Sequence, residues 1–406
     1  MPAGWAWCRF GNFIDVRDGT HYSPKYVEKG YPFVTSKNLV NGKIDFTDVK
    51  YISEKDHNDY IQRSYVEDGD ILFAMIGSIG NPVLVKKDRE FSIKNVALFK
   101  PYSKQLTNMN YLFYFLLWIQ ENLRSKAKGG MQPFIPLSFF RTEVLIPIPP
   151  AEEQFRIVSN IEENLSKIDF IEENKRDLEN IIKQAKSKIL DLAIHGKLVP
   201  QDPNDEPAEE LLKRIATSDN RPYKKFDDEV LFDIPETWAW CTGNDLFNPM
   251  TSKKPEGETF KYIDIDAIDN KKHCVIKTKT LAVSEAPSRA SRKLNNGDVL
   301  FSLVRPYLEN IALIEEKNSD CIASTGFYVC KPRSFVFSKF LFYLMTSEYV
   351  IKGLNQFMKG DNSPSISGDD IKNWRYPLPP LTEQYRIVTK IEELFSSLDI
   401  ISSNIE

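Results

Sequence analysis

The sequence predicts an α+β protein with two similar globular domains and long helices between and after them. The main observation is a repeat, because Pro149–Asp169 and Pro379–Asp399 are identical at 12 of 21 positions. The two copies start 230 residues apart, whereas the units of a solenoid run roughly 20–50 residues. A whole domain is therefore repeated, and 406 residues leave room for two domains of roughly 150 residues each.

Shorter matches extend the repeat back through both domains. PAGWAWC at the N-terminus returns as PETWAWC at Pro235–Cys241, and DGDILF at Asp68–Phe73 returns as NGDVLF at Asn296–Phe301. In the second pair a Gly-Asp turn leads into an apolar run. This pattern predicts strands over Ile71–Ile76 and Val299–Val304.

Each domain is expected to contain one amphipathic helix near its end. Tyr111–Arg124 and Phe340–Leu354 have apolar residues three and four positions apart, as the buried face of a helix requires. Proline pairs at Pro149–Pro150 and Pro379–Pro380 then end the domains, because proline interrupts regular structure.

A helix about 65 Å long is predicted to follow, from Ala151 to His195. Acidic residues fill its first turn, where the helix dipole favours negative charge, and Gly196 ends it. Its apolar stripe is narrow and needs a partner helix, for which the segment from Leu381 onward is the candidate. The predicted seam residues are Val158, Ile161, Leu165, Ile168, Leu178, Ile182, Ala185 and Ile189.

Composition narrows the class of protein. The net charge is −4 overall, but it divides into +4 for residues 1–150, −7 for 151–234, +2 for 235–380 and −3 for 381–406. The two mildly positive domains therefore leave room for a basic face. The longest apolar run, Tyr111–Ile119, is far below the ~20 residues of a membrane span. Five cysteines without a C-x-x-C pair favour the reducing cytoplasm.

Motifs that carry chemistry are missing from the sequence. The four histidines lack metal-ligand spacing, and neither a G-x-x-x-x-G-K-[ST] phosphate loop nor a G-x-S-x-G elbow occurs. The aromatic-ended N-P-P-[YF] loop of amino-methyltransferases is also absent. We therefore predict no catalytic residue, no metal site and no cofactor bound by this chain.

A longer motif indicates a family. AIHGKLVPQDPNDEPAEELLKRI at Ala193–Ile215, together with the two PP-x-x-EQ-x-RIV helix starts, resembles the DNA-specificity subunit of type I restriction-modification systems. The resemblance covers essentially the whole chain. It implies two α/β target recognition domains, separated by long helices that form an antiparallel coiled coil. The implied boundaries are residues 1–150 for the first domain, 151–234 for the central conserved helical spacer and linker, 235–380 for the second domain, and 381–406 for a truncated distal conserved helical region.

The resemblance also implies a function without catalysis. Each domain would read one half of a bipartite, asymmetric site in double-stranded DNA. The chain would dock two adenine-methyltransferase subunits, and restriction-translocase subunits would join them. S-adenosylmethionine, ATP and Mg²⁺ would then be bound by those partner subunits. The helix starts Glu153–Glu163 and Glu383–Glu393 are the expected places for methyltransferase docking.

The distal helix departs from the repeat. After Asp169 the first copy continues for 26 residues to His195, whereas seven residues follow Asp399. Two explanations stay open: either the sequence stops early, or another chain completes the spacer.

Residues that read DNA are expected in turn-rich segments, where Arg, Lys, Asn and Gln side chains can match base edges. In the first domain the candidates are His21, Thr35, Ser36, Lys37, Asn38, Ser78, Lys94, Asn95 and Gln132. In the second domain they are Lys253, Lys254, Arg305, Tyr307, Thr325, Lys359, Asn362 and Ser363.

Two other functions compete with this interpretation. A single-chain nuclease or methyltransferase with an unrecognised motif would turn over DNA in the presence of S-adenosylmethionine and Mg²⁺. A protein-binding coiled-coil scaffold would show no log-linear loss of DNA affinity with salt.

Overall fold

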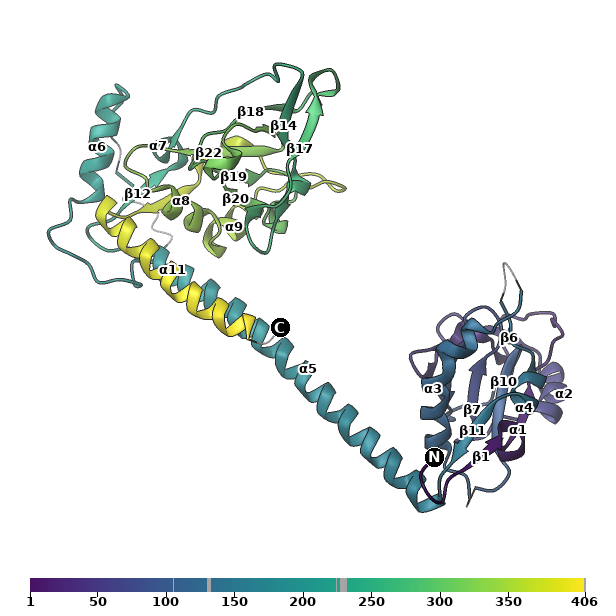
Figure 1. Cartoon of the computed structure of the whole chain (residues 1–406). Helices are drawn as coiled ribbons and strands as arrows, with labels where there is room; N and C mark the ends of the chain where they lie inside the picture. Colours follow the sequence, from purple (N-terminus) through teal and green to yellow (C-terminus); the bar gives the residue numbers. More distant parts are fainter. Residues whose placement is uncertain (105, 130–132, 224, 227–231, 405–406) are drawn as a thin grey trace. The chain divides into compact units, whose positions relative to one another are not determined.

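The computed structural model describes the chain except residues 105, 130–132, 224, 227–231 and 405–406. The chain divides into two compact units, Met1–Glu172 and Glu173–Glu406, which are called unit 1 and unit 2 below (Figure 1). The long helix α5 (Ala151–Ile194) contributes its first half to unit 1 and its second half to unit 2.

Unit 1 is built from short strands with helices beside them. Its strands are β1 (Ala6–Arg9), β2 (Ile14–Asp18), β3 (Tyr31–Val34), β4 (Leu39–Val40), β5 (Lys43–Ile44), β6 (Lys50–Ile52), β7 (Ile71–Ala74), β8 (Gly80–Leu84), β9 (Ser92–Ile93), β10 (Val96–Pro101) and β11 (Leu145–Ile148). Its helices before α5 are α1 (Phe10–Phe13), α2 (Glu54–Ser64), α3 (Met109–Ser125) and α4 (Leu137–Thr142), with a 3-10 turn, η1, at Ser36–Asn38.

Unit 2 repeats this order after α6 (Ala208–Ser218). Its strands are β12 (Ala239–Thr242), β13 (Phe247–Asn248), β14 (Thr259–Ile263), β15 (Ile268–Asp269), β16 (Cys274–Val275), β17 (Lys279–Ala282), β18 (Ala290–Lys293), β19 (Val299–Ser302), β20 (Ile311–Leu313), β21 (Ile322–Ser324), β22 (Phe327–Pro332) and β23 (Arg375–Leu378). Its other helices are α7 (Gly243–Leu246), α8 (Ser338–Met345), α9 (Glu348–Asn355), α10 (Gly368–Asn373) and α11 (Leu381–Ser403). Its 3-10 turns are η2 (Ile265–Ala267), η3 (Val283–Glu285), η4 (Pro306–Leu308) and η5 (Glu316–Asn318).

The sheets of the two units correspond, except that the sheet with the parallel pair has three strands in unit 1, β6-β3-β9, and a fourth strand in unit 2, β17-β14-β21-β18. The order β2-β10-β7-β8 in unit 1 matches β13-β22-β19-β20 in unit 2, and the joint pair β1-β11 matches β12-β23. A further sheet in each unit contains one parallel pair, β3 with β9 and β14 with β21. The sequence repeat is therefore a repeat of topology, including the uncommon parallel pairing.

The Gly-Asp turn repeats because its geometry is demanding. Gly69 and Gly297 adopt φ values of 83° and 87°, a region that side chains with a Cβ rarely enter. The aspartate that follows is buried and closes the turn, because Asp70 accepts from Glu67 N at 2.7 Å and Asp298 accepts from Asn295 N at 2.8 Å. The predicted strands follow as β7 and β19, each ending two residues earlier than expected.

The glutamine of the PP-x-x-EQ motif fastens each helix start to its own domain. Gln154 is buried, accepts from Asn108 N at 3.3 Å and donates to the carbonyl of Pro149 at 3.0 Å. Gln384 is also buried, accepts from Phe337 N at 2.8 Å and donates to the carbonyls of Phe335 and Pro379 at 3.2 and 3.1 Å. Both glutamines satisfy backbone groups that would otherwise be buried without a partner.

The predicted helices are present, with one break. α3 covers the predicted Tyr111–Arg124, but the predicted Phe340–Leu354 is divided into α8 and α9. Ser347 causes the division, because its hydroxyl is buried and accepts from Val350 N as the cap of α9. A single continuous helix in unit 2 is thus a wrong prediction.

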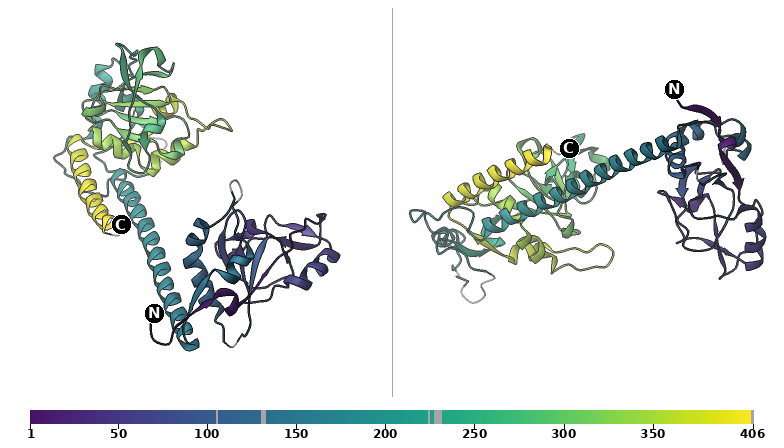
Figure 2. Two further views of the ribbon diagram at one scale, coloured as in Figure 1. Left: turned by 45° about the vertical axis from the view of Figure 1, so that its right-hand side comes forward. Right: turned by 90° about the horizontal axis from the view of Figure 1, so that it is seen from below.

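Within unit 2, α11 lies antiparallel to the second half of α5, as Figures 1 and 2 both show. Leu190 and Ala193 of α5 share one core cluster with Ile387 and Ile391 of α11. Lys186 forms an ion pair with Asp399 farther along the two helices. The expected end of α5 is also present, since Gly196 has φ 66° and a Cβ added there would lie 2.3 Å from Pro235.

The predicted seam residues differ in their surroundings. Val158 and Ile182 are buried, whereas Leu165 and Ile168 are 44% and 51% exposed. The other four, Ile161, Leu178, Ala185 and Ile189, are half-buried. A continuous seam through all eight residues stays a prediction.

Candidate nucleic-acid interface

The same edge of both units gathers many of the predicted DNA-reading residues. The parallel strands β3 and β9 end at Val34 and Ile93, and the residues that follow are Thr35 and Lys94. In unit 2, β14 and β21 end at Ile263 and Ser324. Because parallel strands end at the same edge of a sheet, the segments after them lie together.

The segment Thr35–Asn38 of unit 1 contains both a frame and an exposed side chain. Asn38 is buried, and its amide oxygen accepts from Thr35 N at 2.9 Å and from the Thr35 hydroxyl at 3.0 Å. Its amide nitrogen donates to the carbonyl of Asp45 at 3.1 Å. These bonds assign Thr35 and Asn38 to holding the turn, while Lys37 is exposed and Ser36 bonds weakly to the carbonyl of Asn95 at 3.5 Å.

His21 connects this edge to two further residues. Its ring nitrogens lie 2.8 Å from Asn95 Oδ1 and 2.8 Å from Asp18 Oδ2. Asp18 is buried and also pairs with Arg63, whose side chain is exposed. Lys94 donates to the hydroxyl of Ser23. The structure thus brings three predicted residues together and adds Asp18 and Arg63, which sequence reasoning missed.

A second group of loops forms in each unit around the end of β7 or β19. In unit 1, Gly77 N donates to the carbonyl of Pro133 at 2.9 Å, which places Ser78 close to Pro133. Gln132 lies outside the described residues.

In unit 2 the equivalent loop brings most of the remaining candidates together. Arg305 N donates to the carbonyl of Pro364 at 2.7 Å, and its guanidinium donates to the carbonyl of Asn362 at 3.1 Å. Tyr307 lies two residues farther on, in η4. The 359–365 loop is closed by a hydrogen bond from Lys359 N to the carbonyl of Ser365 at 2.9 Å, and Asn362 and Ser363 lie within this loop.

Arg305 occupies an unusual backbone position. Its φ and ψ are 48° and 56°, a left-handed conformation that costs a non-glycine residue roughly 1 kcal/mol or more. The bonds to the 359–365 loop hold it there, so the guanidinium is fixed by the fold.

The parallel edge of unit 2 holds the last candidates. Lys253 and Lys254 are exposed, and Lys253 N donates to the carbonyl of Ser291 at 2.9 Å. Thr325 N donates to the carbonyl of Arg289 at 2.8 Å. Arg289 and its partner Asp264 were missed from the sequence, since they are 25 residues apart and belong to no motif.

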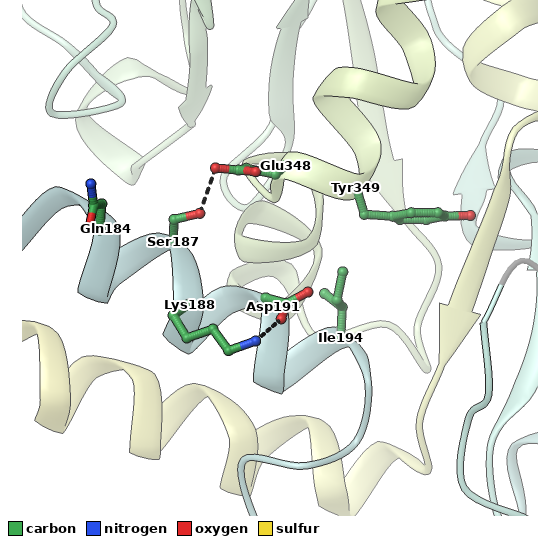
Figure 3. Close-up of a pocket in the computed structure, with 7 residues that line it drawn as sticks. All are labelled: Gln184, Ser187, Lys188, Asp191, Ile194, Glu348 and Tyr349. Carbon is green, nitrogen blue, oxygen red and sulfur yellow. Dashed lines mark hydrogen bonds and ion pairs between the residues drawn. The ribbon is translucent and has the colours of Figure 1, made fainter.

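A cavity of about 340 Å³ lies between α5 and α9 within unit 2 (Figure 3). Its charged groups already have partners: Ser187 donates to Glu348 at 2.8 Å, and Lys188 pairs with Asp191 at 2.6 Å. Glu348 also pairs with Lys352, and these hydrogen bonds lower its pKa. The cavity is therefore a polar contact between two helices, without a group set aside for chemistry.

Reactive or metal-binding groups do not gather in the described part of the chain. No cluster of three or more His, Cys, Asp or Glu residues there could hold a metal ion. Burial raises the pKa of the Cys241 and Cys330 thiols well above the ordinary value, which makes them poor nucleophiles. None of the described helices combines the length and apolar character needed to cross a membrane.

Comparison with known families agrees with this geometry. The profile described as the type I restriction modification DNA specificity domain matches residues 2–180 and again residues 235–406. The chain belongs to this family. Both matches begin near the repeated P-x-x-W-A-W-C segment and run into the repeated helix, so the family unit is the repeat itself.

Similar proteins are named as specificity subunits of type I restriction enzymes. The EcoAI specificity subunit of Escherichia coli is 25% identical over 98% of this chain and 78% of that relative. The MjaVIII specificity subunit of Methanocaldococcus jannaschii is 24% identical over 98% of this chain and 88% of that relative. Specificity subunits are non-catalytic, and the chain is a DNA sequence-recognition subunit of a complex.

Solved structures show the same fold. The HsdS subunit from Thermoanaerobacter tengcongensis superposes with a TM-score of 0.56 at 19% identity and covers 100% of this chain and 94% of its own. A chain from a type I restriction-modification system, solved to describe complex assembly and conformational transition, gives 0.59 at 21% identity over 100% and 93% of the two chains. The expected fold class is confirmed: two similar domains of mixed helix and sheet, with long helices that pair antiparallel.

Proposed function

We propose that this chain reads a bipartite, asymmetric site in double-stranded DNA, with one half-site for each unit. The supporting observation is the parallel edge described above. The backbone there is the same in both units, whereas the side chains after the strands differ: Thr35–Asn38 follows β3, and Asp264–Ala267 follows β14. One topology with two sets of side chains suits two unlike half-sites.

The proposal includes the domain boundaries inferred from the sequence. Residues 1–150 and 235–380 are the target recognition domains, and residues 151–234 and 381–406 form the helical spacer between the half-sites. Half-site spacing then follows from protein geometry rather than from base contacts.

The partners are the second part of the proposal. Two adenine-methyltransferase subunits dock on the repeated helix starts, and restriction-translocase subunits join for cleavage, in the cytoplasm. S-adenosylmethionine, ATP and Mg²⁺ belong to those subunits. Support comes from the helix starts themselves, where Phe155 and Tyr385 stand at the same position of the repeat and are 61% and 50% exposed. Large exposed apolar side chains often mark contact surfaces.

Domain exchange tests the first part. Residues 1–150 are replaced by the equivalent domain of a relative, and the methylated-adenine consensus is mapped in cells that carry the parent or the hybrid chain. We expect one half-site to change while the other half-site and the gap are kept. A hybrid in which both half-sites change together would contradict independent reading.

A biochemical control separates the competing functions. The purified parent chain is incubated with DNA, S-adenosylmethionine and Mg²⁺, and no methyl transfer or cleavage is expected. DNA affinity is expected to fall log-linearly with salt, whereas a protein-binding scaffold would show no such dependence.

A further inference from the structure

A depression of about 520 Å³ lies on unit 2 at the carboxyl ends of β14 and β21. Two ion pairs line it, Arg289 with Asp264 and Lys279 with Asp266, each at 2.6 Å, together with Asn310. Neither family membership nor the candidates chosen from sequence assign a role to these residues.

The guanidinium of Arg289 is fixed from two directions. Its side chain is 57% exposed, and its Nη2 donates to Oδ2 of Asp264, whose side chain is only 13% exposed. The other carboxylate oxygen of Asp264 accepts from Ile265 N at 3.0 Å, so the acceptor is itself held by its turn. The bond from Thr325 N to the Arg289 carbonyl fixes the backbone.

The turn that holds Arg289 fits tightly. A Cβ added to Gly326, which follows Thr325, would lie 3.0 Å from Ile265 Cδ1. The two segments after the parallel strands therefore pack closely beside the Arg289–Asp264 pair, and the bonds to Asp264 and Thr325 orient Arg289. Preorganisation of this kind lowers the ordering cost of binding.

The charges of the depression decide what kind of ligand fits. Each cation is matched by a carboxylate, so the depression offers no excess positive charge to a phosphate. The guanidinium of Arg289 is charged in any case, and Asp264 and then Tyr262 raise its pKa further. A guanidinium has five N–H donors in a planar fork, and most of them stay available beyond Asp264. A neutral, polar edge with two acceptors fits this arrangement better than an anion does.

We propose that Arg289, oriented by Asp264, reads a guanine in the half-site of unit 2 through its N7 and O6 atoms. The proposal rests on the function proposed above and names one specificity-determining residue for it. Paired contacts from arginine to guanine are the commonest specific contact in the major groove. Such a contact favours guanine over other bases by roughly ten- to hundred-fold.

Unit 1 supports the inference independently. At its own parallel edge the buried Asp18 holds the exposed Arg63 and contacts His21. The sequences of the two edges are unrelated, yet each presents an exposed cation held by a shielded aspartate. Both units therefore present an oriented cation at this edge.

The test is methylation mapping with Arg289→Ala and Arg289→Lys in cells that express the full chain with its own partner subunits. For both variants we expect the preference for guanine to fall by ten-fold or more at one position of one half-site. Lysine keeps the charge but not the fork. The other half-site and the gap should be unchanged. Lys317→Ala is the matched control, since Lys317 is an exposed, ion-paired cation on unit 2, and it should reproduce the parent consensus.

Each other outcome overturns the inference. Retention of the guanine preference by Arg289→Ala shows that Arg289 does not read this base. Full retention by Arg289→Lys shows that a positive charge without the planar fork is enough, which contradicts the paired contact proposed here. If methylation falls uniformly at all sites while the consensus is kept, Arg289 contacts the DNA phosphate backbone and not a base. Loss of all methylation without a relaxed class of sites assigns it to folding or assembly. If the parent chain itself supports no methylation pattern, the proposed function fails first, and that result is distinct from a failure of Arg289 alone.

Discussion

Unit 1 and unit 2 contain the same buried aspartate in different company. In unit 1, Asp70 pairs with Lys100 at 2.6 Å. In unit 2, Lys331 occupies the equivalent position but donates to Thr251 at 2.8 Å, and among the described residues the carboxylate of Asp298 bonds to Asn295. Burial raises the pKa of both carboxyl groups, that of Asp298 to about 6. The turn thus requires an acceptor for its backbone, while the nearby cation is free to serve another purpose.

The repeated helix starts also differ in their surroundings. Glu383 is fully buried and accepts from Trp238 Nε1 at 2.9 Å and from Gln201 at 2.6 Å. Glu153, at the same position of unit 1, is half-buried, and no partner is found in the described residues for the indole nitrogen of Trp5. The same sequence motif is therefore buried in the core of unit 2 and lies nearer the surface in unit 1. Sequence identity between the two repeats therefore reflects the same connection between domain and helix, and it does not imply that the matching residues are equally buried.

The largest expected effect compares Ile391→Asp with Ile161→Asp. Ile391 is fully buried in the core of unit 2, so an unpaired carboxylate there should cost about 4 kcal/mol or more. Ile161, its counterpart, is half-buried and should cost about 2 kcal/mol or less. Calorimetric melting of both variants measures the difference, and equal losses would contradict the contrast between the two helix starts.

The next comparison is Arg386→Ala with Arg156→Ala. Arg386 pairs with the shielded Asp205 at 2.6 Å, and its loss should destabilise unit 2 by about 3 kcal/mol at pH 7. Arg156 is exposed, so its loss should change stability by less than about 0.5 kcal/mol.

The same pair predicts a pH dependence. Hydrogen bonding to Arg386 lowers the pKa of Asp205, so the pair stabilises the fold above the ordinary aspartate pKa and loses that effect as pH falls. The cost of Arg386→Ala should therefore shrink in acid. Denaturant titrations at pH 7 and at about pH 3, below the ordinary aspartate pKa, measure it, and a cost that grows in acid would be inconsistent with the ion pair.

A smaller effect is expected from the two glutamines. Gln384→Leu leaves Phe337 N and two carbonyls without their partner, and should cost about 2 kcal/mol. Gln154→Leu removes two hydrogen bonds, and the one from Asn108 N is long at 3.3 Å. This variant should therefore cost about 1 kcal/mol. Thermal melting checks the order, and the reverse order would show that the helix start of unit 1 depends more on its glutamine.

The smallest effect separates the two aspartates by pH. The folded pKa of Asp298 is about 6, above the unfolded value, so its ionisation weakens the fold as pH rises through 6. The difference in stability between Asp298→Asn and the parent should therefore shift in favour of the variant by about 1.4 kcal/mol from pH 5 to pH 8. Asp70→Asn is the comparison: burial also raises the pKa of Asp70, but the hydrogen bond from Lys100 opposes that rise, so the shift between pH 5 and pH 8 should have the same direction and be smaller.

Local patterns explain which elements were predictable from sequence. The spacing of apolar residues gave α3 and α5, and the Gly-Asp pairs marked β7 and β19, because each signal lies within a few neighbouring residues. The break between α8 and α9 at Ser347 was not predicted, because the neighbouring residues are apolar and the capping role of Ser347 depends on its burial in the tertiary structure. A serine inside a periodic run gives no warning of this in the sequence.

The interface was predictable in residue type but not in partnership. His21, Lys94 and Asn95 were chosen for polarity in turn-rich segments, and the parallel pairing of β3 with β9 brings them together. Arg63 and Arg289 were missed because their aspartates are 45 and 25 residues away along the chain. Long-range pairing of this kind is fixed by strand order, which composition and periodicity do not contain.

The two glutamine joints have a consequence for how such a gene can be inherited. Within the described part of the chain, Gln154 bonds to Asn108 and Pro149, and Gln384 bonds to Phe335, Phe337 and Pro379. Each joint is therefore complete within the stretch of DNA that encodes one copy. A crossover or break between the copies passes on an intact joint with either half, so new pairings of domains can arise without a second, compensating mutation.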